Sequence, residues 1–196
     1  MPHGIDLPAQ STTDWTSSVA LICSIVALAI GVVTLPTAFQ MFFGRPKIAF
    51  DFDDRHKGGM HLLHCDISNE GIKSRFLRFI GVTRSRAEIS AFLEIFEYKT
   101  DRVILPQTPA RITTDREEGW QVSLPFSVAP ARIAIIVDND AGASVVPQGD
   151  SEIMSLEVGK YRIEIDIITD TQKSFKGTKY AIIGQRGDRA YWADNV

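Results

Sequence analysis

The stretch that decides the fold runs from Val19 to Phe43 and reads VALICSIVALAIGVVTLPTAFQMFF. It contains no charged residue. An α-helix rises about 1.5 Å per residue, so roughly 20 apolar residues cross the hydrocarbon core of a bilayer. The stretch is long enough to do so with some tilt, which predicts one N-terminal transmembrane helix over residues 15–44.

Aromatic side chains stand near both ends of this stretch, with Trp15 at one end and Phe39, Phe42 and Phe43 at the other. Such residues favour the membrane–water interface. The stretch has two competing interpretations, a buried core helix and a cleaved signal peptide. A core helix would show a polar stripe, which is absent, and a signal peptide would begin with basic residues, whereas no Lys or Arg precedes Arg45. We therefore favour a retained anchor.

Basic side chains flank only the C-terminal side of the predicted span, as Arg45, Lys47, Arg55 and Lys57. The positive-inside rule then places that side in the cytoplasm. This predicts a single-pass protein of the cell membrane, with an extracytoplasmic tail at 1–14 and a soluble cytoplasmic domain at 45–196. A free thiol at Cys65 is compatible with a reducing compartment.

A seam of small residues follows the predicted helix at alternating spacings of three and four. Its members are Ser17, Ala20, Ser24, Ala27, Gly31, Thr34 and Ala38. Small residues let helix backbones approach closely in lipid, where packing drives association. We therefore expect a homo-oligomer that assembles through the helix, with a kink near Pro36.

After Pro46 the apolar pattern changes to a period of two, which is typical of half-buried strands. In the clearest run, Ile163, Ile165 and Ile167 alternate with charged residues. The strand candidates are 47–53, 61–69, 88–98, 121–128, 132–138, 160–169 and 175–183. Turn-forming clusters separate these runs and no long amphipathic helix interrupts them, so we expect an all-β antiparallel sandwich.

The residues Leu156-Glu157-Val158-Gly159-Lys160-Tyr161, followed by alternating isoleucines, resemble the tyrosine corner of immunoglobulin-like and fibronectin-III-like domains. The resemblance implies an immunoglobulin-like sandwich in which the hydroxyl of Tyr161 bonds back to the main chain. It implies a fold and no particular activity.

The sequence holds no catalytic signature and gives no reason to expect a cofactor. A formal net charge of -3 argues against a general nucleic-acid binder. His61, His64 and Cys65 are potential zinc ligands, but alternation along a strand turns His64 away from the other two. Asp138–Gly142 has calcium-loop character but lacks the distal glutamate, which favours a hairpin turn.

The segment Ile72–Arg86 reads IKSRFLRFIGVTRSR and concentrates basic charge without any acidic residue. Its basic members are Lys73, Arg75, Arg78, Arg84 and Arg86. Bulky apolar residues between them fit an anionic membrane surface. The segment would equally suit a phosphorylated ligand or an acidic partner, or it could be an ordinary connection whose apolar residues tuck under the sandwich.

Together these features favour a membrane-anchored, self-associating binding or sensing module with a cytoplasmic β-sandwich. The partners we expect are the lipid bilayer, further copies of the chain, and an anionic lipid or acidic partner. A competing function is an oligomeric transmembrane effector or small channel gated by its cytoplasmic domain, as in bacterial anti-phage systems, supported by the small-residue seam with Ser24, Thr34 and Gln40. An envelope protein with an external domain and a metal-dependent enzyme are two further functions compatible with the sequence.

Overall fold

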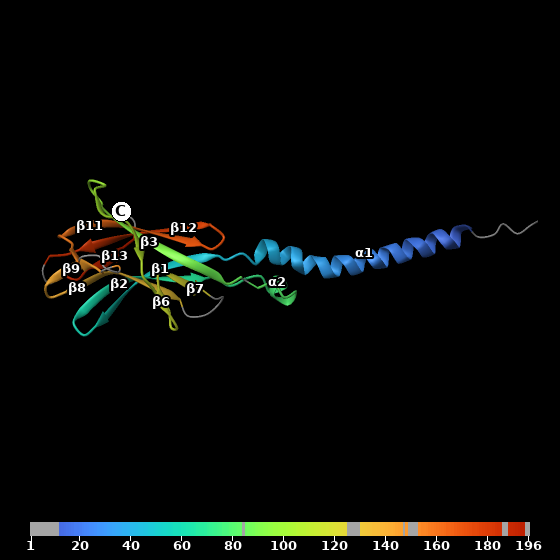
Figure 1. Ribbon diagram of the computed structural model, residues 1–196, viewed down its shortest axis with the longest axis horizontal. Helices are drawn as coiled ribbons and strands as arrows, with labels where there is room; N and C mark the ends of the chain where they lie inside the picture. The colour runs from blue at the N-terminus through green and yellow to red at the C-terminus, as the bar shows by residue number, and fades with distance from the viewer. Residues whose placement is uncertain are drawn as a thin grey trace, which may run out of the picture.

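The computed structural model describes residues 12–83, 85–124, 130–146, 148, 153–185 and 188–194. Over these residues the chain forms a long N-terminal helix, α1 (Thr12–Phe43), that projects from a β domain (Figure 1). The segment Ser17–Phe43 of α1 is long and apolar enough to cross a membrane, with a mean hydropathy of 2.6. No other helix among the described residues meets that criterion. Pro36 lies inside α1, which continues past it to Phe43.

Two antiparallel sheets make up the domain. The first has the order β1-β2-β8-β5-β6, with β9 beside β8 and β10 beside β9. Its strands are β1 (Ile48–Lys57), β2 (Met60–Asn69), β5 (Ile112–Thr113), β6 (Glu118–Gly119), β8 (Ala131–Asn139), β9 (Gly142–Val145) and β10 (Met154–Ser155). The chain therefore enters the first sheet at its edge strand, directly after the helix.

The second sheet has the order β13-β12-β11-β3-β4, with β7 beside β3. Its strands are β3 (Ala87–Glu97), β4 (Val103–Ala110), β7 (Gln121–Leu124), β11 (Gly159–Thr169), β12 (Ser174–Ile183) and β13 (Tyr191–Ala193). The two sheets enclose one core of buried aliphatic side chains, which confirms the predicted helix plus antiparallel β-sandwich.

Alternation along the strands builds this core as expected. Ile163, Ile165 and Ile167 of β11 are wholly buried, as are Cys65 and Ile67 of β2. Removing one large aliphatic side chain from water contributes about 1.5–3 kcal/mol, so the alternating runs supply most of the driving force.

The start of β11 has the geometry that the tyrosine corner implies. Tyr161 is 5% exposed, and its hydroxyl donates a hydrogen bond of 2.9 Å to the carbonyl oxygen of Glu157. This bond fixes the path of the chain as it enters the centre of the second sheet.

Each of the expected runs contains a strand. For 121–128 the strand ends at Leu124, and 125–129 lie outside the described residues. The strand β4, which holds Pro106 and Pro109, was not expected. Proline has no N–H to donate and is confined to sheet edges, and β4 is the last strand of its sheet. A short helix, α2 (Arg75–Phe79), was also not expected.

Candidate functional site

The end of α1 is fastened to the sandwich by the side chain of Gln40. Its Nε2 donates to the carbonyl oxygen of Thr83 at 2.8 Å, and the amide of Thr83 donates to its Oε1 at 3.0 Å. The carboxamide thus pairs with Thr83 through both a donor and an acceptor, as a peptide group would in a sheet. Two reciprocal bonds hold the orientation of the helix end more firmly than one bond could.

Further main-chain and side-chain bonds extend this attachment into both sheets. The amide of Ser85 donates to the carbonyl of Gly44 at 2.6 Å, and Asn69 links the carbonyl of Ser85 to the amide of Lys47. A Cβ at Gly44 would lie 2.4 Å from atoms of Gln40, so only glycine fits there. We call this set, formed by Gln40, Gly44, Asn69, Thr83 and Ser85, the junction.

The middle of the basic segment forms α2. The hydroxyl oxygen of Ser74 caps this helix by accepting a hydrogen bond of 3.3 Å from the amide of Leu77. The ring of Phe76 meets the ring of Phe39 edge-on, with 6.3 Å between centroids, so α2 lies beside the end of α1 (Figure 1). The segment is therefore held at the helix end of the sandwich.

The apolar residues of the segment divide into three groups, one of which, Leu77 and Ile80, is half-buried. Ile72 and Val82, near its ends, are buried against the domain. Phe76 and Phe79 are 59% and 88% exposed, and no residue of α2 is buried. The interpretation in which all of these side chains tuck under the sandwich is therefore wrong for the two phenylalanines.

The basic residues of the segment are also divided. Lys73, Arg75 and Arg78 are exposed on α2 and its N-terminal flank. Arg86 lies further on and donates to the hydroxyl of Ser123 on β7. Arg84 lies outside the described residues. We call Lys73, Arg75, Phe76, Arg78 and Phe79 the collar.

The seam of small residues on α1 is uncovered, since each of its members is exposed. A Cβ added at Gly31 would meet no atom of the chain within 4 Å. The hydroxyls of Ser24 and Thr34 donate to carbonyls one turn earlier, each at 2.8 Å. The seam is thus an open apolar surface whose polar groups already have partners.

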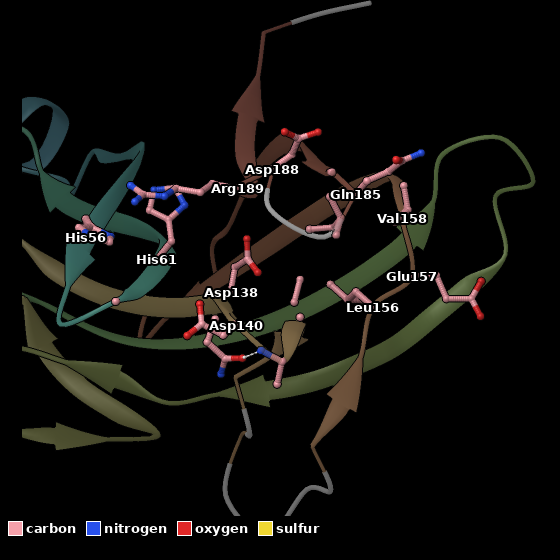
Figure 2. A pocket seen from close by; sticks show the side chains of 17 residues that line it. His56, His61, Asp138, Asp140, Leu156, Glu157, Val158, Gln185, Asp188 and Arg189 are labelled. Atoms are coloured by element: carbon pink, nitrogen blue, oxygen red, sulfur yellow. Dashed lines mark hydrogen bonds between the residues drawn. The ribbon is translucent and has the colours of Figure 1, made fainter.

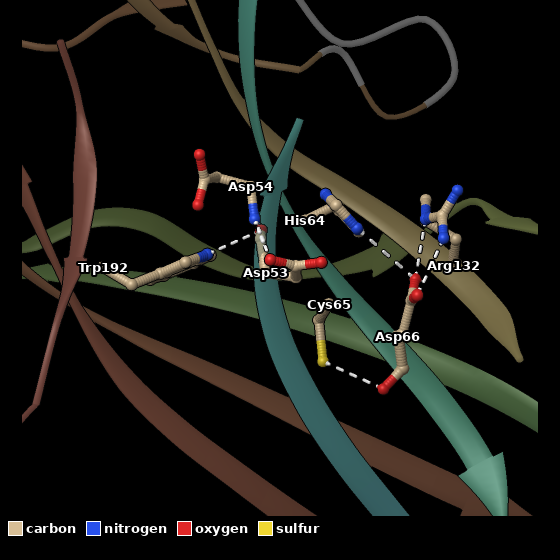
Figure 3. A network of polar contacts seen from close by, with 7 residues as sticks. All are labelled: Asp53, Asp54, His64, Cys65, Asp66, Arg132 and Trp192. Carbon is tan, nitrogen blue, oxygen red and sulfur yellow. Dashed lines mark hydrogen bonds and ion pairs between the residues drawn. The ribbon is translucent and has the colours of Figure 1, made fainter. Parts of the chain in front are cut away.

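The histidine-rich strand β2 does not bring its candidate ligands His61, His64 and Cys65 together around one ion, and Figure 3 shows the last two. The Nε2 of His61 lies 2.6 Å from a carboxylate oxygen of Asp54 near the β1–β2 turn. Cys65 is wholly buried in the core, and burial raises the pKa of its thiol well above its usual range, so it stays protonated. No group of three or more potential ligands that could hold a metal ion occurs in the described part of the chain.

His64 lies on the opposite face of β2, as alternation predicts. It is wholly buried, with its Nε2 3.7 Å from Asp66 (Figure 3). The carboxylate of Asp66 in turn accepts two hydrogen bonds, each of 2.7 Å, from the guanidinium of Arg132. Burial lowers the pKa of His64, although Asp66 opposes this shift. The imidazole is therefore neutral at physiological pH.

The Asp138–Gly142 stretch forms a hairpin turn between β8 and β9. The amide of Ala141 donates to the side chain of Asn139 at 2.8 Å, and Gly142 has a positive φ of 121°. The side chain of Asn139 therefore helps to close the turn, as Asx residues and glycine favour.

A cleft of about 960 Å³ opens at the end of the sandwich farthest from α1 (Figures 1 and 2). Its walls come from the β1–β2, β8–β9, β10–β11 and β12–β13 connections. Its charged and histidine side chains are His56, His61, Asp138, Asp140, Glu157, Asp188 and Arg189. The described lining thus combines two histidines, four carboxylates and one guanidinium.

Sequence reasoning missed both the junction and the cleft. The bonds between Gln40 and Thr83 join residues 43 positions apart. The cleft is assembled from four separate connections, and neither the Asp138–Gly142 turn nor the Leu156–Tyr161 stretch showed in sequence that they lie beside each other. Comparison of the chain with protein-family models finds no match, and none of the curated proteins matches it either.

Proposed function

We propose that this protein is a self-associating, single-pass membrane protein whose cytoplasmic, immunoglobulin-like β-sandwich is a binding or sensing module. Its N-terminus lies outside the cell and α1 crosses the membrane. The hydrogen bond from Tyr161 to Glu157 supports the immunoglobulin-like assignment. The charge difference across α1 supports the orientation.

The junction is the observation that carries this proposal. A simple anchor needs only a flexible linker, whereas here the helix end is bonded to the loop that leads into β3 and, through Asn69, to β2. The sandwich is therefore mounted at a fixed orientation to the helix axis. The cleft at its far end then points away from the bilayer, toward soluble partners (Figure 1).

The polar residues that would favour an effector or channel have partners within the chain. Ser24 and Thr34 bond within their own helix, and Gln40 bonds with Thr83. None of these groups needs water or an ion as a partner. The binding module is therefore the function that the geometry supports best.

A distance measurement tests the fixed mount. Spin labels are attached to cysteines that replace Val33 on α1 and Lys99 on the sandwich, both exposed, with Cys23→Ala to remove the native thiol in the span. The full chain is reconstituted in liposomes and diluted with unlabelled protein, so that only distances within one chain are read. We expect one narrow distance distribution.

Gln40→Ala removes both reciprocal bonds and should broaden that distribution. Met41→Ala is the matched control, because Met41 is the next residue of the helix and is 70% exposed. A broad distribution in the otherwise unaltered chain would mean that the sandwich swings freely, and the proposal would fail.

A further inference from the structure

The geometry of the collar points to a specific partner. We propose that the collar binds the anionic lipid headgroups of the leaflet next to the sandwich, beside the chain's own anchor. The inference rests on α1 crossing the membrane, as proposed above, but on neither self-association nor a ligand for the cleft.

The depth of the collar in the membrane follows from the length of the helix. Ser17–Phe43 has 27 residues, and such a helix is roughly 40 Å long, whereas the hydrocarbon core is about 30 Å thick. Tilt can take up part of this excess. Arg45 and Lys47 directly follow the span and favour the headgroup region, so the last turns of α1 lie at that level. Phe39 lies in those turns and contacts Phe76, so α2 lies at the same depth.

Apolar side chains are exposed at this depth. Phe79 is 88% exposed and Phe76 is 59% exposed. On α1, Met41 and Phe42 are also 70% and 73% exposed at this level. Aromatic side chains at the end of a membrane helix are best accommodated in the interfacial layer. The bilayer surface thus gives these side chains an apolar environment that the protein does not.

Positive charge accompanies the exposed rings. Lys73, Arg75 and Arg78 are exposed, and none of them forms an ion pair with a described residue. Attraction to an anionic surface fades within a Debye length, about 8 Å at physiological ionic strength. The contact between Phe76 and Phe39 keeps the three charges within that range of the headgroups.

Lipid is favoured over a soluble phosphate ligand by the shape of the collar. A phosphate site is normally concave and partly closed, with several donors directed at one point. The collar instead is a short helix with no buried residue, which presents charges and aromatic rings together. That combination matches a surface with both phosphates and an apolar layer.

Fluorescence quenching in the full chain tests the inference. Phe79→Cys, in the Cys23→Ala chain, carries an environment-sensitive fluorophore, while Cys65 is buried and stays unlabelled. The protein is reconstituted in vesicles of phosphatidylcholine alone or with phosphatidylglycerol. Nitroxide-bearing lipids report membrane contact, and iodide reports contact with water. With phosphatidylglycerol present, we expect the ratio of lipid to iodide quenching to rise at least about threefold and to fall with added salt.

The combined change Lys73→Glu, Arg75→Glu and Arg78→Glu should abolish that rise. The matched control, Lys99→Glu with Arg102→Glu and Arg116→Glu, alters the net charge equally at exposed positions outside the collar and should keep it. Circular dichroism verifies that both variants are folded.

Three outcomes would overturn the inference. The first is an equal quenching ratio in neutral and anionic vesicles, and the second is equal behaviour of the two charge variants. The third is release of the probe into water by millimolar inorganic phosphate at constant ionic strength, which would assign the collar to a soluble phosphate.

Discussion

Replacing Tyr161 with phenylalanine should destabilise the sandwich by about 1 kcal/mol. A typical buried hydrogen bond contributes about 0.5–1.5 kcal/mol net, and leaving a partner unpaired costs about 1–3 kcal/mol. The hydroxyl of Tyr161 is lost from a side chain that is 5% exposed, but its partner Glu157 is an exposed residue whose carbonyl can bind water instead. The cost therefore lies near the middle of the first range.

The effect should also depend on pH in a specific direction. Burial, followed by the charge of Glu157, raises the pKa of Tyr161 above its ordinary value. The neutral hydroxyl therefore contributes stability that is complete below about pH 10 and is lost as the pH rises through the raised pKa. The phenylalanine variant lacks this contribution, so the stability difference between the two proteins should shrink at alkaline pH.

Thermal unfolding of the full chain in detergent, followed by tryptophan fluorescence, measures the change. For a chain of this size, 1 kcal/mol corresponds to a shift of about 2–4 °C in the thermal midpoint. Tyr191→Phe is the matched control, because Tyr191 is 51% exposed. If the two variants were equally stable, the bond from Tyr161 to Glu157 would not hold the corner.

Three further predictions concern the helix, the orientation and the buried histidine. Gly31→Ile should lower the fraction of chains that cross-link in native membranes, because a bulky side chain separates the backbones, whereas Val32→Leu should not; equal behaviour would reject the seam. In whole cells, Lys99→Cys should react with a membrane-impermeant thiol reagent only after permeabilisation, and ready labelling beforehand would reverse the orientation. Because burial lowers the pKa of His64, the unfolded chain takes up the proton first, so the free energy of unfolding should fall as the pH drops through about 6.5. His64→Gln should lack that part of the pH dependence, and an unchanged profile would assign it to different groups.

The parts of the fold that could be predicted are those determined by local pattern. Alternation alone predicts that Ile163, Ile165 and Ile167 lie in the core, and it sets His64 apart from Cys65. β4 was missed because Pro106 and Pro109 normally argue against a strand, and only its place at a sheet edge permits them.

The site was less predictable because it depends on contacts between distant residues. The basic charge and the aromatic residues of the collar were visible in sequence, but a helix of five residues is too short for a periodic pattern. The sequence alone could not show whether the side chain of Phe79 is buried or exposed, because that depends on how α2 packs in the fold. The pairing of Gln40 with Thr83 depends on where the β2–β3 connection passes the helix, which no local pattern specifies.

The two prolines of β4 affect how neighbouring copies of the sandwich can interact in a membrane. If copies of the chain associate through their helices, as proposed above, their sandwiches share effective concentrations that reach the millimolar range. At such concentrations an open strand edge is a template for unwanted pairing with a neighbour. Pro106 and Pro109, which have no N–H to donate, lie in this edge strand and disfavour such pairing. Association through the helices, as proposed, would then leave the sheets of adjacent copies separate at this edge.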